Sequence, residues 1–86
     1  MRIELKKFGK VLTSRPMGKE AFAAIRPILD PDADTVEIDF TGVLSLSPSW
    51  ADEFFTALKN MYGNRIKYLP TDNPSVIETL KILEDI

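Results

Sequence analysis

The chain has 86 residues and a formal net charge of −2 at pH 7, and its 44% hydrophobic and 28% charged residues are typical of a soluble globular domain. A chain of this length cannot divide its buried surface between two cores, so residues 1–86 are expected to form a single domain. With no Cys, no His and no long run of like charges, the sequence argues against thiol, histidine and zinc chemistry, and against nucleic acid or an anionic membrane as a partner. We therefore expect no catalytic residue, no metal and no cofactor.

The N-terminal residues alternate between apolar and charged side chains. Ile3 and Leu5 fall on one side and charged residues on the other between positions 2 and 6, which is the period of a strand with one buried face. Gly9 then permits a turn, and residues 10–12 are long enough for a second short strand. The turn could be the bend of a hairpin or a bulge within one strand.

Ser14 and Pro16 mark the start of the first predicted helix. Ser14 is suited to be its N-cap, and Pro16 lies in the first turn, where a missing N–H costs nothing. Pro27 is expected to weaken the last turn, before a polar loop over residues 30–34. The apolar residues at helical spacing form one stripe of Met17, Ala21, Phe22, Ile25, Ile28 and Leu29.

Two further pairs of a strand and a helix follow. Residues 35–40 alternate again and predict a strand, and the three- and four-residue steps of the apolar residues from Pro48 predict a helix that ends at Gly63. Residues 65–69 predict another short strand, and Asn73 is expected to cap a third helix.

The order of these elements predicts the fold class. Strands that alternate with helices imply right-handed crossovers and a mainly parallel sheet. Strands covered on both faces would be almost entirely apolar, whereas these strands alternate, so the helices should cover one face. We expect a two-layer α/β fold, with a mainly parallel or mixed sheet of about four strands and three helices packed on one face.

Three segments of the sequence are similar to one known family. They are Gly9 to Arg15 with Leu12, then Asp39-Phe40 with Val43, then Trp50 to Glu53. With these segments the chain resembles, over most of its length, a STAS-like domain family of unknown function that is related to the STAS domains of bacterial anti-sigma factor antagonists. The resemblance implies a STAS-like fold and a regulatory protein–protein interaction module.

In the antagonists, a serine at the start of the helix is phosphorylated by a partner kinase, and this phosphorylation controls binding. Here Ser47 stands in place of the family's aspartate, and Pro48 and Ser49 stand in place of its two hydroxyl residues. Trp50 replaces a small residue. The resemblance makes Ser47 and Ser49 candidate phospho-acceptors, and it implies a protein partner such as a kinase or an ATPase-type regulator. The implied contact surface consists of Ser45, Trp50, Asp52 and Glu53.

Helix capping is the competing interpretation of these serines. Ser47 could be the N-cap before Pro48. Ser49 could instead form a capping box with Asp52, and either cap would stabilise the fold by about 1 kcal/mol. Capping and regulation do not exclude each other.

Arg15 and three carboxylates suggest two other functions. A cation in the first turn of a helix opposes the helix dipole, so Arg15 should pair with an anion such as Asp39, Glu53 or a bound ligand. A ligand at this position would make the domain a sensor of a small anionic or nucleotide molecule. Asp39, Asp52 and Glu53 could instead hold Mg²⁺, but adjacent helical residues point about 100° apart and should not converge on one atom.

Apolar residues on the second and third helices leave two structural alternatives open. Trp50 is expected either to be buried against Phe54 or to be displayed as an interface anchor. The other apolar residues of the second helix could be covered by neighbouring helices or could form a partner surface. Ile82 and Ile86 on the third helix could join that surface or make a homodimer contact.

The sequence also predicts a cellular location. No apolar stretch approaches the roughly 18 residues that a membrane-spanning helix needs, and the first residues lead directly into a folded pattern without a signal peptide. We therefore expect a cytoplasmic protein with no membrane partner, and the family resemblance implies a bacterial one.

Overall fold

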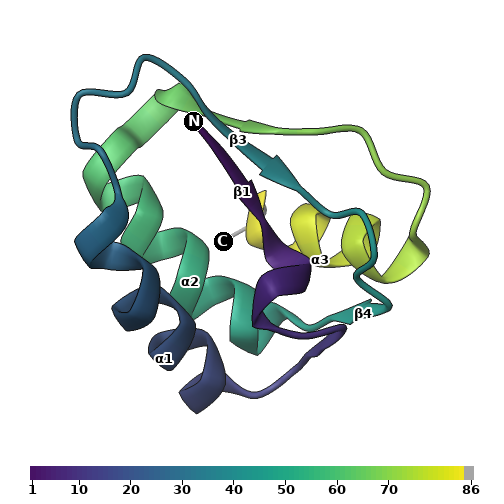
Figure 1. The fold of residues 1–86 in the computed structure, drawn as a ribbon. Coiled ribbons are helices and arrows are strands. Elements are labelled where there is room, and N and C mark those ends of the chain that lie inside the picture. The colour runs from purple at the N-terminus through teal and green to yellow at the C-terminus, as the bar shows by residue number, and fades with distance from the viewer. Residues whose placement is uncertain (85–86) are drawn as a thin grey trace.

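The computed structural model describes residues 1–84, in which two strands precede each of the first two α-helices and one strand precedes the third (Figure 1). The strands of this part of the chain are β1 (Arg2–Glu4), β2 (Val11–Leu12), β3 (Val36–Asp39), β4 (Ser45–Leu46) and β5 (Ile66–Tyr68). Its α-helices are α1 (Arg15–Ile25), α2 (Pro48–Tyr62) and α3 (Pro74–Glu84). Its short 3₁₀ helices are η1 (Leu5–Phe8), η2 (Arg26–Ile28) and η3 (Gly63–Arg65).

The strands form two small parallel sheets. One has the order β1-β3-β5, and the other consists of β2 and β4. The α/β class, the parallel pairing and the three helices agree with the sequence prediction, within residues 1–84. One sheet of about four strands is not confirmed, because the pairing is divided between two sheets. The hairpin alternative for the first two strands is wrong, because β2 pairs with β4 and runs parallel to it.

The three-stranded sheet has one buried face and one polar face. In β3, Val36 and Ile38 are fully buried, whereas Glu37 is only partly buried. On the polar face, the Arg2 guanidinium lies 3.5 Å from the Glu37 carboxylate on the neighbouring strand. Helices α1 and α2 lie side by side against the buried face, and α3 packs against α2 and β4 (Figure 1). Alternation in the sequence therefore identified the covered face correctly.

The first strand is shorter than the alternation predicts. It ends at Glu4, and the chain then turns through η1. In a 3₁₀ helix, side chains three residues apart point to the same side, so Leu5 and Phe8 both reach the core. Gly9 ends this turn with a φ of 129°, in a region that other residues rarely adopt. The sequence prediction extended the first strand too far, because the position of Leu5 fits both the alternation of a strand and the three-residue spacing of a 3₁₀ helix.

The apolar stripe of the first helix is also shorter than predicted. Helix α1 ends at Ile25, and Pro27 lies in η2, as expected of a proline that weakens a last turn. Met17 is 56% exposed and Ile28 is 77% exposed, so these two members of the predicted stripe lie at the surface, whereas its last member, Leu29, is buried. The middle of the stripe, including Ala21, packs in the core.

Helices α1 and α2 approach each other very closely at Gly18. A Cβ atom built on Gly18 would lie 2.5 Å from the backbone oxygen of Trp50 and 3.0 Å from its Cα. Real side chains do not come this close to a rigid backbone. Glycine is therefore required at this position by the packing of the two helices.

We predict that Gly18→Ala destabilises the protein by about 1–3 kcal/mol, because the added methyl group forces the two helices apart. The free energy of unfolding is measured by urea denaturation. Lys19→Ala, at an exposed position of the same helix, is the control and should change stability by less than about 0.5 kcal/mol. Alanine is favoured over glycine by about 1 kcal/mol in a helix, so a more stable Gly18→Ala protein would contradict this close contact.

Candidate functional site

The paired strands β2 and β4 lead directly into α1 and α2, so both helices begin at the same end of the molecule. The Ser14 hydroxyl accepts a hydrogen bond from the Met17 amide at 3.2 Å and caps α1. The Ser47 hydroxyl accepts one from the Trp50 amide at 3.3 Å and caps α2. We call the surface formed by Arg15, Ser47, Ser49, Asp52 and Glu53 the α1–α2 corner.

Ser47 has a structural role in this corner. In addition to capping α2, its hydroxyl donates a hydrogen bond of 2.6 Å to the backbone oxygen of Thr13, just before α1. The hydroxyl therefore connects the starts of the two helices. The N-cap interpretation of Ser47 is confirmed, and the alternative capping box of Ser49 with Asp52 does not form, because Ser49 lies inside the first turn of α2 and is not its N-cap.

Ser49 differs from Ser47 in its surroundings. It lies in the first turn of α2 and is partly exposed. No hydrogen bond joins its hydroxyl to another group within residues 1–84, whereas the hydroxyl of Ser47 both donates and accepts. Of the two serines expected to be phospho-acceptors, only Ser49 has a hydroxyl that the fold does not already use.

Arg15 binds two carboxylates of α2. Its Nη1 donates to Asp52 Oδ2 at 2.8 Å and to Glu53 Oε1 at 3.1 Å. Glu53 was an expected partner, whereas Asp52 was not. The expectation that adjacent acidic residues cannot meet at one atom is wrong here, because a guanidinium that approaches from a second helix can lie between them. Arg15 thus already holds two anions.

The contacts between Arg15 and the two carboxylates shift the pKa values of Arg15 and Asp52. The hydrogen bond from Arg15, and then that from Thr56 Oγ1 at 3.1 Å, lowers the pKa of Asp52. The same hydrogen bonds to Asp52 and Glu53 raise the pKa of Arg15. Two carboxylates surround one guanidinium, so the cluster carries a net negative charge at neutral pH.

Two other residues of the expected contact surface are less accessible. Trp50 is 1% exposed, and its ring stacks on Phe54 with centroids 4.8 Å apart. The alternative that Trp50 is buried against Phe54 is therefore confirmed. The alternative that it is displayed to a partner is wrong, because the ring lies beneath the corner in the aromatic core. Ser45 is partly buried in β4, opposite Val11 of β2.

Asp39 does not join the other acidic residues. It lies at the end of β3, and its Oδ1 accepts a hydrogen bond of 2.9 Å from the Thr41 amide. This bond is the main reason that the pKa of Asp39 is lowered. Within residues 1–84, no three acidic side chains lie close enough together to hold a metal ion.

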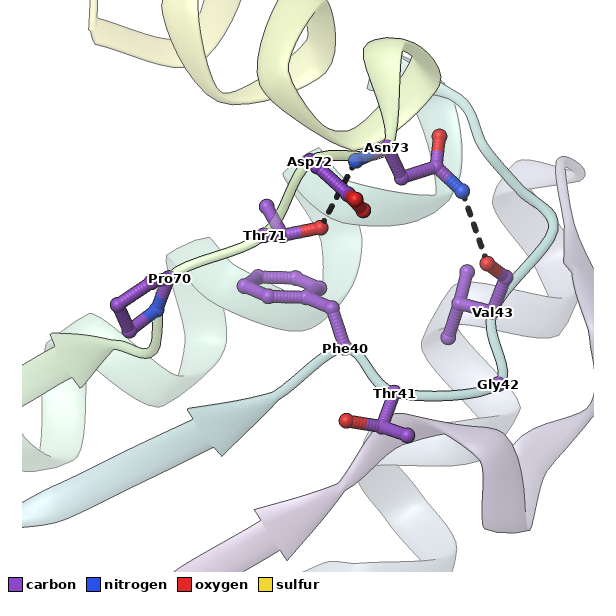
Figure 2. Close-up of a pocket in the computed structure, with 8 residues that line it drawn as sticks. All are labelled: Phe40, Thr41, Gly42, Val43, Pro70, Thr71, Asp72 and Asn73. Atoms are coloured by element: carbon purple, nitrogen blue, oxygen red, sulfur yellow. Dashed lines mark hydrogen bonds between the residues drawn. The ribbon is translucent and has the colours of Figure 1, made fainter.

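A second feature, which sequence reasoning missed, is an open hollow of about 590 Å³ at the carboxyl ends of β3 and β5 (Figure 2). Figure 2 shows the Phe40 ring between its two sides, and the Thr41 and Asp72 side chains near its rim. Two loops after neighbouring parallel strands were the available signal, because α/β folds often place ligands there. The hollow is lined by residues 40–43 and residues 70–73.

Asn73 connects the two sides of this hollow (Figure 2). Its Nδ2 donates to the backbone oxygens of Val43 at 2.9 Å and Leu44 at 3.2 Å. Its Oδ1 accepts from the amides of Ser75 at 2.8 Å and Val76 at 3.4 Å, at the start of α3. The predicted cap of the third helix is thus present, and it also fixes the loop before β4.

Most of the chain is similar to a known family of domains. A family model described as a STAS-like domain of unknown function matches residues 18–76. This range includes Ser47, Ser49, Asp52 and Glu53 and begins after Arg15. No curated protein and no solved structure matches the chain. Within residues 1–84, no helix has the length and apolar character needed to cross a membrane.

We predict that Asn73→Ala lowers the free energy of unfolding by about 2–3 kcal/mol, because it removes both the cap of α3 and the bonds to the loop before β4. Asn73→Asp retains the capping oxygen and loses only the donors, so it should cost about half as much. Asp72→Ala, at the neighbouring exposed position, is the control and should change the free energy of unfolding by less than about 0.5 kcal/mol. Urea denaturation distinguishes these values, and equal stability of all three variants would contradict the role of Asn73.

We also predict that Arg15→Gln raises the pKa of Asp52 toward the ordinary value of about 3.9, because the largest cause of its lowering is removed. The pKa is read from an NMR titration of the Asp52 carboxyl carbon. A carboxyl with a lowered pKa in the folded state adds stability above its ordinary pKa, and this stability is lost as the pH falls through the folded value. Arg15→Gln should therefore make stability less dependent on pH below about 4.

Lys81→Gln is the matched control for this titration. The Lys81 ammonium lies 3.9 Å from the Glu78 carboxylate on the exposed side of α3, and Asp52 pairs with Arg15 and not with Lys81. Its replacement should leave the pKa of Asp52 unchanged. The ion pair at the corner would be refuted if Arg15→Gln also left this pKa unchanged.

Proposed function

The chain belongs to the STAS-like domain family of unknown function, and we propose that it is a non-enzymatic regulatory module that binds another protein through the α1–α2 corner. The family establishes the type of domain and no activity, so the proposal rests on the chemistry of the corner. The observation that carries it is the contrast between Ser47, whose hydroxyl the fold uses, and Ser49, whose hydroxyl it leaves available.

We propose Ser49 as the phospho-acceptor. A phosphate in the first turn of a helix meets amide groups without helical partners and the positive end of the helix dipole, so the helix can accommodate it. Phosphorylation would add about 1.5 to 2 negative charges beside a cluster that is already negative. Binding of an acidic partner surface would weaken, and Arg15 would be drawn away from Asp52 and Glu53.

The surface around Ser49 suits a protein partner. Arg15, Asp52 and Glu53 are all partly exposed, and Met17, in the first turn of α1, is 56% exposed. Charged groups around an apolar side chain are common at protein interfaces. By analogy with the anti-sigma factor antagonists, the proposed partner is a kinase or an ATPase-type regulator in a bacterial cytoplasm.

A sensor of a small anionic or nucleotide ligand near Arg15 is the alternative, and it has less support. Such a ligand would compete with Asp52 and Glu53, which already bind the guanidinium at 2.8 and 3.1 Å. A ligand that binds only the folded state raises the melting temperature. A rise with nucleotides or phosphate esters that Arg15→Gln abolishes would favour the sensor over the protein-binding module.

We predict that Ser49→Glu loses a partner that the wild type and Ser49→Ala both retain, in an affinity pull-down from native cells read by mass spectrometry. The same experiment should find phosphate on Ser49 and not on Ser47. The matched control is Ser47→Ala, which removes a cap worth about 1 kcal/mol and should still capture the partner while the protein remains folded. Identical partners for all variants, with Ser49 unmodified, would refute the switch.

A further inference from the structure

The outer edge of β1 is an unpaired strand edge. Strand β1 lies at one side of the β1-β3-β5 sheet and pairs only with β3 within residues 1–84. The Glu37 amide donates to the Met1 backbone oxygen at 2.8 Å, which fixes the register of the ladder. Backbone groups of successive residues in a strand point to opposite sides, so those of Ile3 face β3, whereas the Arg2 groups and the Glu4 amide face away from the sheet. The Glu4 carbonyl belongs to the first turn of η1.

An apolar groove runs beside this edge. Its volume is about 200 Å³, and it lies between β1 and the end of α1. Phe8, Ile25 and Ile28 contribute its apolar wall. Ile28 is 77% exposed, more than any other large hydrophobic side chain of the described residues. An open strand edge next to exposed apolar surface is a common place for another chain to pair.

The sequence of β1 is complementary to itself. It reads Arg2-Ile3-Glu4, so an antiparallel copy of the same strand centred on Ile3 places each Arg2 opposite the other Glu4. We propose that β1 pairs in this way with β1 of a second copy of the chain. In this register the Glu4 amide of each copy donates to the Arg2 carbonyl of the other, and opposite charges in cross-strand pairs stabilise a sheet.

The proposed symmetry also brings the two grooves together. A two-fold axis perpendicular to the sheet keeps the buried faces of both copies on one side, so Ile28 of one copy approaches the groove of the other. The existing ion pairs of Arg2 with Glu37 and of Lys7 with Glu4 are 3.5 and 3.8 Å long and exposed. Such surface pairs contribute little, so they leave both charges available for the second copy.

A pair of charge-reversal variants tests this register by sedimentation equilibrium. The wild-type weight-average mass should rise with concentration toward twice that of one chain. Arg2→Glu places acids opposite acids, and Glu4→Arg places bases opposite bases, so each variant alone should keep the mass of one chain. An equimolar mixture of the two variants restores opposite charges at both cross-strand pairs and should recover the larger mass.

The controls separate this edge from other surfaces. Glu78→Arg reverses an exposed charge on α3 that also belongs to an ion pair, and it should associate like the wild type. Ile28→Ser should reduce association, and the high exposure of Ile28 allows this change without loss of the fold. The proposal is overturned if the wild type keeps the mass of one chain at every concentration, or if Arg2→Glu alone associates as well as the wild type.

Discussion

The close approach of α1 and α2 at Gly18 determines the positions of the main features of the α1–α2 corner. Because Gly18 has no side chain, the first turn of α2 can lie directly against α1 at Trp50. The Trp50 ring is then enclosed and stacks on Phe54. Arg15 lies one turn before Gly18, so the same contact brings its guanidinium beside Asp52. A packing constraint in the core thus creates the charge cluster at the surface.

Side chains, in place of further strands, complete the small β2–β4 sheet. The Ser75 hydroxyl accepts from the Leu46 amide at 3.0 Å and donates to the Leu46 oxygen at 3.1 Å, and the Thr79 hydroxyl donates to the same oxygen. These bonds explain why Thr79 is buried in α3, which apolar periodicity could not predict. The two sheets therefore differ at their outer strands. Side chains of α3 form hydrogen bonds with the outward backbone groups of β4, whereas no other element within residues 1–84 pairs with the outer side of β1.

The sequence predicts local structure well where a single residue type decides the backbone. Ser14, Ser47 and Asn73 are the caps that they were expected to be, and Pro27 lies in the 3₁₀ turn that follows α1, as expected of a proline that weakens a last helical turn. Periodicity alone failed at Leu5, which fits both a strand and a 3₁₀ helix. Contacts between distant segments were the least predictable, since Glu53 was only one of several expected partners of Arg15 and Asp52 was not among them.

The family resemblance and the structure supply different parts of the functional argument. The resemblance pointed to residues 45–53 as the functional region. The structure then shows which of these side chains have a structural role in the fold and which do not. Ser47 holds two helices together and Trp50 fills the core, whereas Ser49 has no such task. A regulatory change at Ser49 can therefore alter the surface charge without removing a bond on which the fold depends.

The corner and the outer edge of β1 lie at opposite ends of α1. Arg15 begins this helix of 11 residues, and Ile28 follows its other end, so the helix alone separates the two surfaces by about 16 Å. A dimer formed through β1 would leave both corners exposed. One dimer could then present two corners to the same partner assembly, and the second contact would form at high effective concentration. Weak binding at a small corner would in this way become strong, while the charge at each Ser49 would still decide whether its own corner binds.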